Sequence, residues 1–478
     1  MASLSGPAQL FRMHALAACA GLIWFAGPLW AQATRPFDTV VERYVAAGLT
    51  SNLALQSETL EVEKTAEALA EARARFFPEV SIEGRYTRAD GGREFTVPLG
   101  TALNPVYSTL NDMLVEQGQE PRFPQVADET VRFLREREQD TRLVLRQPLY
   151  APAIPAAVRA QRALLGASSY RRMAIARALR RDITIAYTDW LKARNSVEIV
   201  TASHALLAEN LRVNESLFEN GKITEDQVLR AKAELLAVEQ QVREIENLRT
   251  QAQSYFNFLL NRDLQAPIEA TAAPTIQTER DTALEQLWAN AIDRRPEIAQ
   301  LEHLRRASEE QVRIARQQKW PTLSLSLDAG TQGEDYGFGE DYNFGVASLV
   351  FTWRLFDGGA DAARVSQARV AERQLVIREE ELAQQIRLEV QQSYDRLQTA
   401  RDSLRTARAR ADAARAGFRI ASRKRDEGVI NQVEFIDARS TLTSAEINHV
   451  STQFDVLARR AELEYATSAG EIPVEPGV

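Results

Sequence analysis

The sequence predicts a mainly α-helical chain with membrane β-strands, built by duplication of a long helical hairpin. The first observation is a heptad seam from Trp190 to Asn214, in which mostly apolar and small residues recur at alternating spacings of three and four. The second is that this seam recurs 207 residues later, from Leu397 to Ala421, without a gap. The third is a change to period two ahead of each long helix, which is typical of amphipathic strands.

Residues outside the seams support the duplication. The same offset pairs identical residues that a shared heptad pattern does not require, and it pairs a glycine at the end of each long helix: Arg180 with Arg387, Tyr187 with Tyr394, Arg194 with Arg401, Ser196 with Ser403, and Gly221 with Gly428. A chance likeness between two heptad helices would not reproduce these matches.

Composition excludes several classes of protein and site. The chain has 478 residues and a net charge of -8, which gives no general attraction to nucleic acid. Its one cysteine, Cys19, rules out a disulfide framework and a cysteine metal site. No motif predicts a cofactor. The three histidines beyond the first 33 residues, at 204, 303 and 449, lack ligand spacing and favour partly packed helical positions. We therefore expect no enzyme.

Residues 1–33 are predicted to be a secretory signal peptide. Arg12 precedes an apolar stretch, and Ala31-Gln32-Ala33 forms a small-x-small cleavage site. The competing interpretation, lipid attachment at Cys19, leaves no room for an apolar core between Arg12 and the processing site. We expect a mature chain that begins at Thr34. It has no run of roughly 18 apolar residues, so it is either soluble or crosses a membrane as β-strands.

The first repeat is predicted at residues 34–265. Its expected elements are helices 38–48 and 52–77, a strand near 80–87, a long polar loop at 89–140, a strand near 143–149, and long helices at 155–220 and 224–260.

A linker with a short helix is predicted at 266–294, and a tail at 471–478. The second repeat, 295–470, is expected to contain a helix starting at Arg295-Pro296-Glu297, strands at 323–328 and 344–356, and long helices at 360–427 and 431–467. Both returning helices begin with the capping-box spacing, Thr224-x-x-Gln227 and Asn431-x-x-Glu434.

Four strands of about ten residues match membrane β-strands in length, but they cannot close a membrane barrel alone. If they span a membrane, several copies must share one barrel, because open edges leave backbone groups unpaired in lipid. The alternative is a soluble periplasmic coiled-coil protein, such as an adaptor.

The order and spacing of several short segments resemble the TolC-like outer-membrane efflux proteins over essentially the whole mature chain. The segments are Phe77 to Val80, Gln147 to Tyr150, Gly221 with Thr224 to Ala231, Arg295 to Glu297, Leu355 to Gly359, and Gly428 to Ala438. The resemblance implies a homotrimer with a twelve-stranded barrel in the outer-membrane lipid and a periplasmic helical tunnel. It also implies a passive exit duct for an inner-membrane transporter, joined through a periplasmic adaptor (membrane fusion) protein.

The resemblance also assigns roles to single residues. It implies that the turns at Gly221-Lys222 and Gly428-Val429 dock the adaptor, although a glycine C-cap explains these turns structurally. It implies that carboxylates at Glu434 and Asp437 ring the periplasmic aperture, although capping explains Glu434 equally well. The acid–arginine latch of the family falls on Gln227 and Ile430 here, so it is absent. Arg425 and Arg230 are the candidates for an alternative closure.

Overall fold

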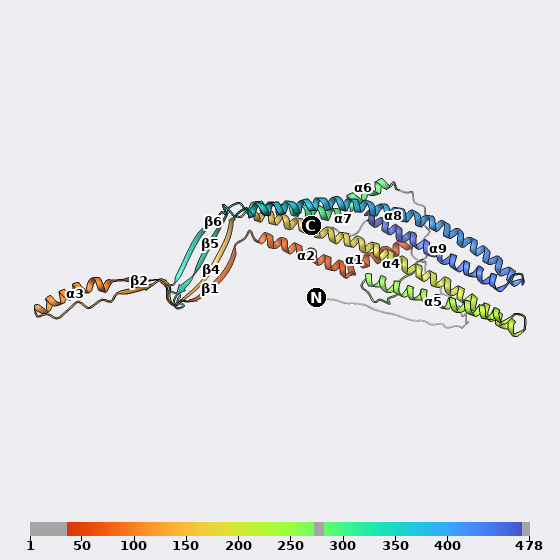
Figure 1. The fold of residues 1–478 in the computed structure, drawn as a ribbon, viewed down its shortest axis with the longest axis horizontal. Coiled ribbons are helices and arrows are strands. Elements are labelled where there is room, and N and C mark those ends of the chain that lie inside the picture. The colour runs from red at the N-terminus through yellow and green to blue at the C-terminus, as the bar shows by residue number, and fades with distance from the viewer. Residues whose placement is uncertain (1–35, 272–281, 471–478) are drawn as a thin grey trace, which may run out of the picture.

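The computed structural model describes residues 36–271 and 282–470. The predicted signal peptide, with Ala31, Ala33 and Cys19, lies outside the described residues, as do the tail and part of the linker. The described chain is elongated, with a narrow arm of helix and strand at one end, a sheet next to it, and long helices that end in two turns at the other end (Figure 1).

The elements alternate as the duplication predicts. In chain order they are α1 (Phe37–Ser51), α2 (Leu53–Ala74), β1 (Glu79–Arg88), β2 (Glu94–Val97), α3 (Leu99–Glu116), β3 (Glu129–Arg132), β4 (Arg137–Tyr150), α4 (Ala153–Glu219), α5 (Glu225–Leu259), α6 (Leu284–Arg294), α7 (Pro296–Gln317), β5 (Thr322–Gly333), β6 (Asn343–Thr352), α8 (Ala360–Asp426) and α9 (Gln432–Ala466). Helices α4 and α8 have 67 residues each, and α5 and α9 have 35 each. At ~1.5 Å per residue, α4 and α8 are each about 100 Å long.

None of the described helices combines the length and the apolar composition needed to cross a membrane.

The main sheet is antiparallel in the order β1-β4-β5-β6, with β1 and β6 as its edges. Val80 lies opposite Leu145, Leu145 opposite Leu327, and Leu325 opposite Leu349. Because directly opposed residues share a face, this register aligns apolar side chains across all four strands. The apolar face is open to solvent in the protomer: Ile82 is 77% exposed and Leu349 is 68% exposed.

The prediction that residues 89–140 form a long polar loop is wrong. That segment contains β2, α3 and β3, and β4 begins at Arg137, well before Leu143. Strand β4 includes the polar residues Gln139 to Thr141, which pair with both β1 and β5. The start of this strand is therefore set by backbone hydrogen bonding and not by an alternation of apolar residues. The helix was missed because Gly100 and Pro105 are usually helix breakers.

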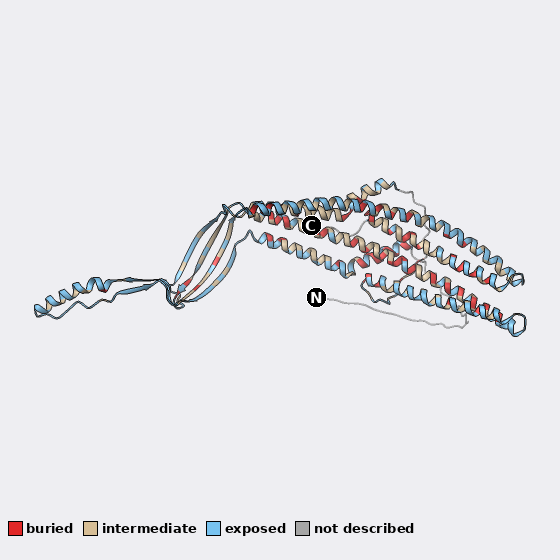
Figure 2. Ribbon diagram, viewed as in Figure 1, coloured by how far each residue is buried: buried red, intermediate tan, exposed pale blue. Residues whose placement is uncertain are grey.

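The largest core cluster joins α1, α4, the end of α5, and α9. Tyr44 meets Phe256 edge to face, with 4.9 Å between ring centroids, and Tyr187 lies 5.7 Å from the same ring. The Tyr187 hydroxyl donates to the Glu269 carbonyl at 2.8 Å, and burial raises the pKa of Tyr187 to about 12. The aromatic cluster therefore fixes the middle of the first repeat, and α9 of the second repeat packs against it through Phe454 and Leu457. Buried residues concentrate along α4 rather than along the sheet (Figure 2).

Candidate functional site

The two hairpin tips have the same backbone geometry. Gly221 and Gly428 have φ angles of 67° and 72°, in the left-handed region that favours glycine. Lys222 N donates to Leu217 O, and Val429 N donates to Lys424 O, both at 2.8 Å. These are the six-residue bonds of the Schellman motif, so each long helix ends at its glycine. No atom lies within 4 Å of a Cβ built on either glycine, so conformation alone requires glycine there.

The side chains at the tips face solvent. Lys222 is exposed, and Val429 is 67% exposed. The first tip thus presents a lysine and the second an apolar valine, and no described residue buries either side chain.

The returning helices begin differently. Asn431 caps α9, because its Oδ1 accepts from Glu434 N at 3.0 Å. The matching residue Thr224 makes no side-chain cap, because its hydroxyl bonds the Asp226 carboxylate instead. The capping-box prediction at Thr224 is therefore wrong, since a carboxylate two residues away competes for the hydroxyl.

Glu434 and Asp437 lie on an exposed side of α9. The opposite side carries Phe435 and Arg439, which are buried. Neither carboxylate makes a hydrogen bond or ion pair with the described residues, and Glu434 does not complete a reciprocal capping box. The two acids are thus free to face an aperture or a neighbouring molecule.

A polar cluster connects the second hairpin to α4 just behind the tips. Asn210 Oδ1 accepts from Arg425 Nη2 at 3.0 Å, from Gln432 Nε2 at 3.1 Å, and from Asn214 Nδ2 at 2.5 Å. The Arg425 guanidinium also lies 4.1 Å from the centre of the Phe435 ring. We call Asn210, Asn214, Arg425 and Gln432 the inter-repeat clasp.

The clasp contains a cation without a carboxylate partner. Burial lowers the pKa of Arg425, and no ion pair to it occurs among the described residues. Arg425 is therefore held by a charge-assisted hydrogen bond and a ring face. The other candidate, Arg230, bonds only within its own helix, at 3.8 Å from Asp226, and does not cross between repeats.

A second set of polar contacts between the two repeats, joining α9 to α4, lies further from the tips. Arg439 Nε lies 3.3 Å from Ser203 Oγ, and Thr443 Oγ1 lies 3.2 Å from the same oxygen. Arg439 is 8% exposed, and burial lowers its pKa. Ser203 and Asn210 were not among the predicted site residues. The signal in the sequence was three polar residues, Ser203, Asn210 and Asn214, on one side of a helix whose seam is otherwise mostly apolar.

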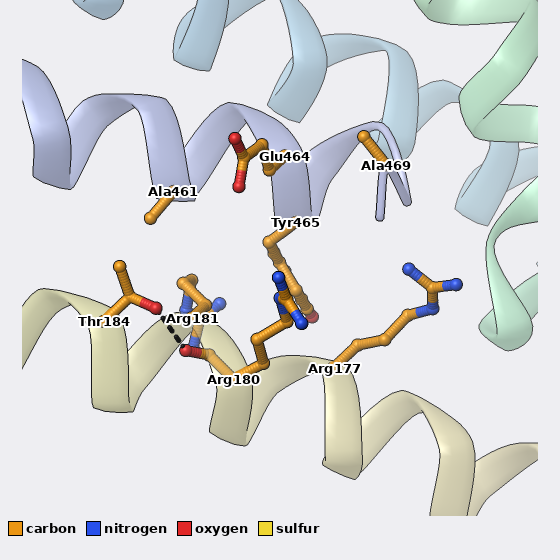
Figure 3. A pocket seen from close by; sticks show the side chains of 8 residues that line it. All are labelled: Arg177, Arg180, Arg181, Thr184, Ala461, Glu464, Tyr465 and Ala469. Carbon is orange, nitrogen blue, oxygen red and sulfur yellow. Dashed lines mark hydrogen bonds between the residues drawn. The ribbon is translucent and has the colours of Figure 1, made fainter. Parts of the chain in front are cut away.

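Three arginines of α4 gather near the end of α9 (Figure 3). Arg181 lies over the Tyr465 ring at 4.3 Å, and Arg177 donates to the carbonyls of Ser468 and Gly470 at 3.1 and 3.3 Å. The cavity between them has a volume of about 20 Å³, which is roughly enough for one water. This cluster therefore anchors the end of the second repeat to α4 and has no room for a larger ligand.

Nothing in the described part of the chain gathers metal ligands: no group of three His, Cys, Asp or Glu residues is placed to hold an ion. His204 faces Glu239 at 3.6 Å, and His303 packs on the Tyr170 ring at 5.3 Å. Both have helical packing partners, as the sequence predicted.

Known proteins are similar to parts of this sequence and to its architecture. Residues 287–469 match the family model of the outer membrane efflux proteins. The outer membrane protein OprJ of Pseudomonas aeruginosa is 28% identical over 226 residues, covering 45% of this chain and 47% of OprJ. A probable efflux pump outer membrane protein of Pseudomonas putida, TtgC, is 24% identical over 215 residues, 44% of this chain and 42% of TtgC. The matched segment thus spans less than half the length of each relative.

Solved structures match over nearly the whole chain. The Campylobacter jejuni outer membrane channel CmeC superposes with a TM-score of 0.74 at 16% identity, covering 92% of this chain and 90% of CmeC. The open state of the Neisseria gonorrhoeae channel MtrE gives a TM-score of 0.68 at 16% identity, covering 90% of this chain and 89% of MtrE. Most of the second repeat, residues 287–469, therefore resembles the outer membrane efflux proteins in sequence, and the chain as a whole has the TolC-like fold of these solved channels.

Proposed function

We propose that the chain is one subunit of a homotrimeric channel in the outer membrane of a Gram-negative cell envelope. It acts as a passive exit duct of a tripartite efflux or type I secretion system and is not an enzyme. The observation that carries this proposal is the sheet, whose apolar face runs across all four strands and whose two edges are open. A soluble periplasmic adaptor, the alternative, would expose this face to water without a partner.

The two faces of the sheet differ in polarity, as the wall of a membrane barrel requires. The face opposite the apolar one carries Glu83, which pairs with Arg146 at 2.9 Å and Arg142 at 3.4 Å. Asp140, on the same face, pairs with Arg85 at 3.3 Å. In a barrel the apolar face contacts lipid and the charged face lines the water-filled lumen. The strands, of 10 to 14 residues, are long enough for tilted crossing.

Three copies supply twelve strands, and β1 of one copy then pairs with β6 of the next. This arrangement removes both open edges, which are costly in lipid. We expect native mass measurement of the detergent-extracted protein to give three times the subunit mass. A folded monomer as the extracted form would contradict both the barrel and the channel function.

The hairpin tips are the proposed docking site for the periplasmic adaptor, which connects the duct to an inner-membrane transporter. Gly221-Lys222 and Gly428-Val429 support this role because they are exposed, similar in geometry, and located at the end farthest from the sheet (Figure 1). Two similar tips in each of three subunits would offer six nearly equivalent contacts around one axis.

Glu434 and Asp437 are the proposed aperture residues. In a trimer they bring six carboxylates around the axis, and such a ring selects and binds cations. We expect Asp437→Ala to raise the concentration of a trivalent cation needed for half block of planar-bilayer conductance roughly tenfold, which corresponds to ~1.4 kcal/mol.

The matched control is Asp412→Ala, which removes an exposed carboxylate of α8 that pairs with Arg415 at 3.1 Å. The trivalent-cation concentration for half block of this variant should equal that of the wild type. If the Glu434→Ala, Asp437→Ala double variant is blocked at the wild-type concentration, the acidic ring is not the cation site.

A further inference from the structure

The segment between β1 and β4 folds into an arm with its own secondary structure, β2, α3 and β3. Strands β2 and β3 pair from Glu94–Arg132 to Val97–Glu129, and α3 follows β2 beyond the end of the sheet (Figure 1). The second repeat has no such arm, because β5 and β6 are joined by the short turn between Gly333 and Asn343. The arm is thus a feature that the duplication does not explain.

One side of α3 is closed by the chain that returns to β3. Asn104 exchanges two hydrogen bonds of 2.8 Å with the Val126 backbone, and the Tyr107 ring lies 5.4 Å from Phe123. Asn111 accepts from the backbone N–H groups of residues 122 and 123 at 3.0 Å. A Cβ on Gly100 would lie 2.2 Å from Val126 O, so glycine is needed for this close approach. The helix is therefore held in one orientation.

Helix α3 is largely exposed (Figure 2), and a second stripe of it, next to the covered one, is apolar. Its spacings of four, three, four and three are those of a heptad seam, and its five residues are Leu99, Leu103, Val106, Leu110 and Met113. They are between 37% and 54% exposed in the protomer. The seam has leucine at both a positions, 103 and 110, and its d positions hold Leu99, the β-branched Val106 and Met113. Leucine at a with a β-branched residue at d favours three or four strands over two.

The charge of α3 argues against a lipid surface as its partner. Helices that lie on membranes carry lysine and arginine beside their apolar face, whereas α3 has neither and ends with Asp112 and Glu116. The arm is also continuous with β1, an edge that the proposed function pairs with a neighbouring copy. Three copies related by one axis would place three identical stripes at the same level along that axis.

We infer that the apolar stripe of α3 docks on the same stripe of the two other copies, forming a parallel three-helix coiled coil beyond the sheet. This inference rests on the proposed trimer. The coiled coil places a helical constriction on the side of the channel away from the hairpin tips, so the duct has a structured exit as well as a periplasmic aperture.

Cysteine crosslinking in the full-length protein tests this arrangement. In a parallel coiled coil, equal seam positions meet at one level, so Leu110→Cys brings three thiols together. We expect a three-armed maleimide to convert most of the purified Leu110→Cys protein to covalent trimer on a denaturing gel. The matched control is Ser108→Cys, which is exposed on the far side of the same helix, and it should stay largely monomeric on that gel. Cys19, the only native cysteine, is common to both variants.

Native mass separates the two proposals. If Leu110→Cys is trimeric by native mass but no more crosslinked than Ser108→Cys, the coiled coil is wrong and the trimer stands. If no trimer is present at all, the proposed function fails first. Equal crosslinking of both variants also contradicts the inference, since it indicates a mobile arm. A blue-shifted, lipid-dependent emission of a dye attached to the introduced thiol of the Leu110→Cys variant, without crosslinking, would assign the stripe to the membrane instead.

Discussion

Arg425→Ala should increase the basal conductance of the channel by opening its periplasmic end. The variant removes a charge-assisted hydrogen bond to Asn210 and a cation–ring contact with Phe435, together worth ~2 kcal/mol in a partly buried site. It also leaves the buried Asn210 with one donor fewer. A loss of ~2 kcal/mol shifts the balance between closed and open tips roughly 30-fold. The measurement is single-channel conductance and open probability in planar bilayers.

Arg423→Ala is the control, because Arg423 lies in the same last turn of α8 with the same charge but is exposed. It should leave open probability unchanged. Asn210→Ala should also raise open probability, and the two changes together should have less than the sum of the single effects, because both break the Arg425–Asn210 hydrogen bond. Additive effects, or a wild-type open probability in Arg425→Ala, would show that the inter-repeat clasp does not hold the tips closed.

Phe256→Ala should cause a large loss of stability. Phe256 is fully buried between Tyr44 and Tyr187, where α1, α4 and α5 meet. Truncation of a buried phenylalanine costs roughly 3–5 kcal/mol, from lost apolar burial and the remaining cavity. For a chain of this size the unfolding entropy is about 1 kcal/mol per degree, so the apparent Tm should fall by roughly 3–5 °C.

Phe256→Leu provides the comparison at the same site. It keeps most of the apolar volume, so its loss should be below ~1.5 kcal/mol, and its Tm should lie close to that of the wild type. Circular dichroism of the purified protein during heating measures both. Equal Tm values for Phe256→Ala and wild type would mean that the aromatic cluster is not a stability centre.

The helical architecture was predictable because heptad periodicity is a local signal. The seams from Trp190 to Asn214 and from Leu397 to Ala421 placed the long helices within a few residues, and the glycines placed both turns. The arm was not predictable by the same rules. Pro105 and Gly100 usually end helices, but here Gly100 is required by the close approach of Val126 O, a contact that depends on tertiary structure.

The candidate site divides in the same way. Exposure of Glu434 and Asp437 could be inferred from their positions on α9, and Arg425 could be named as a candidate from its place near the turn. Its partner Asn210 could not, because it lies 215 residues away in sequence and contact between α4 and the second hairpin depends on how the repeats pack. The capping-box spacing also did not predict that the Thr224 hydroxyl bonds the Asp226 carboxylate instead of a backbone N–H group of α5.

The equal lengths of the paired long helices constrain how this chain can change during evolution. With 67 residues in both α4 and α8, and 35 in both α5 and α9, the two tips end at the same level. An insertion of one heptad into each helix of a single hairpin would move its tip ~10 Å past the other. Asn210 and Arg425 would then no longer meet. Lengthening or shortening of the hairpins is therefore tolerated only when both repeats change together, so lineages should differ by matched pairs of insertions.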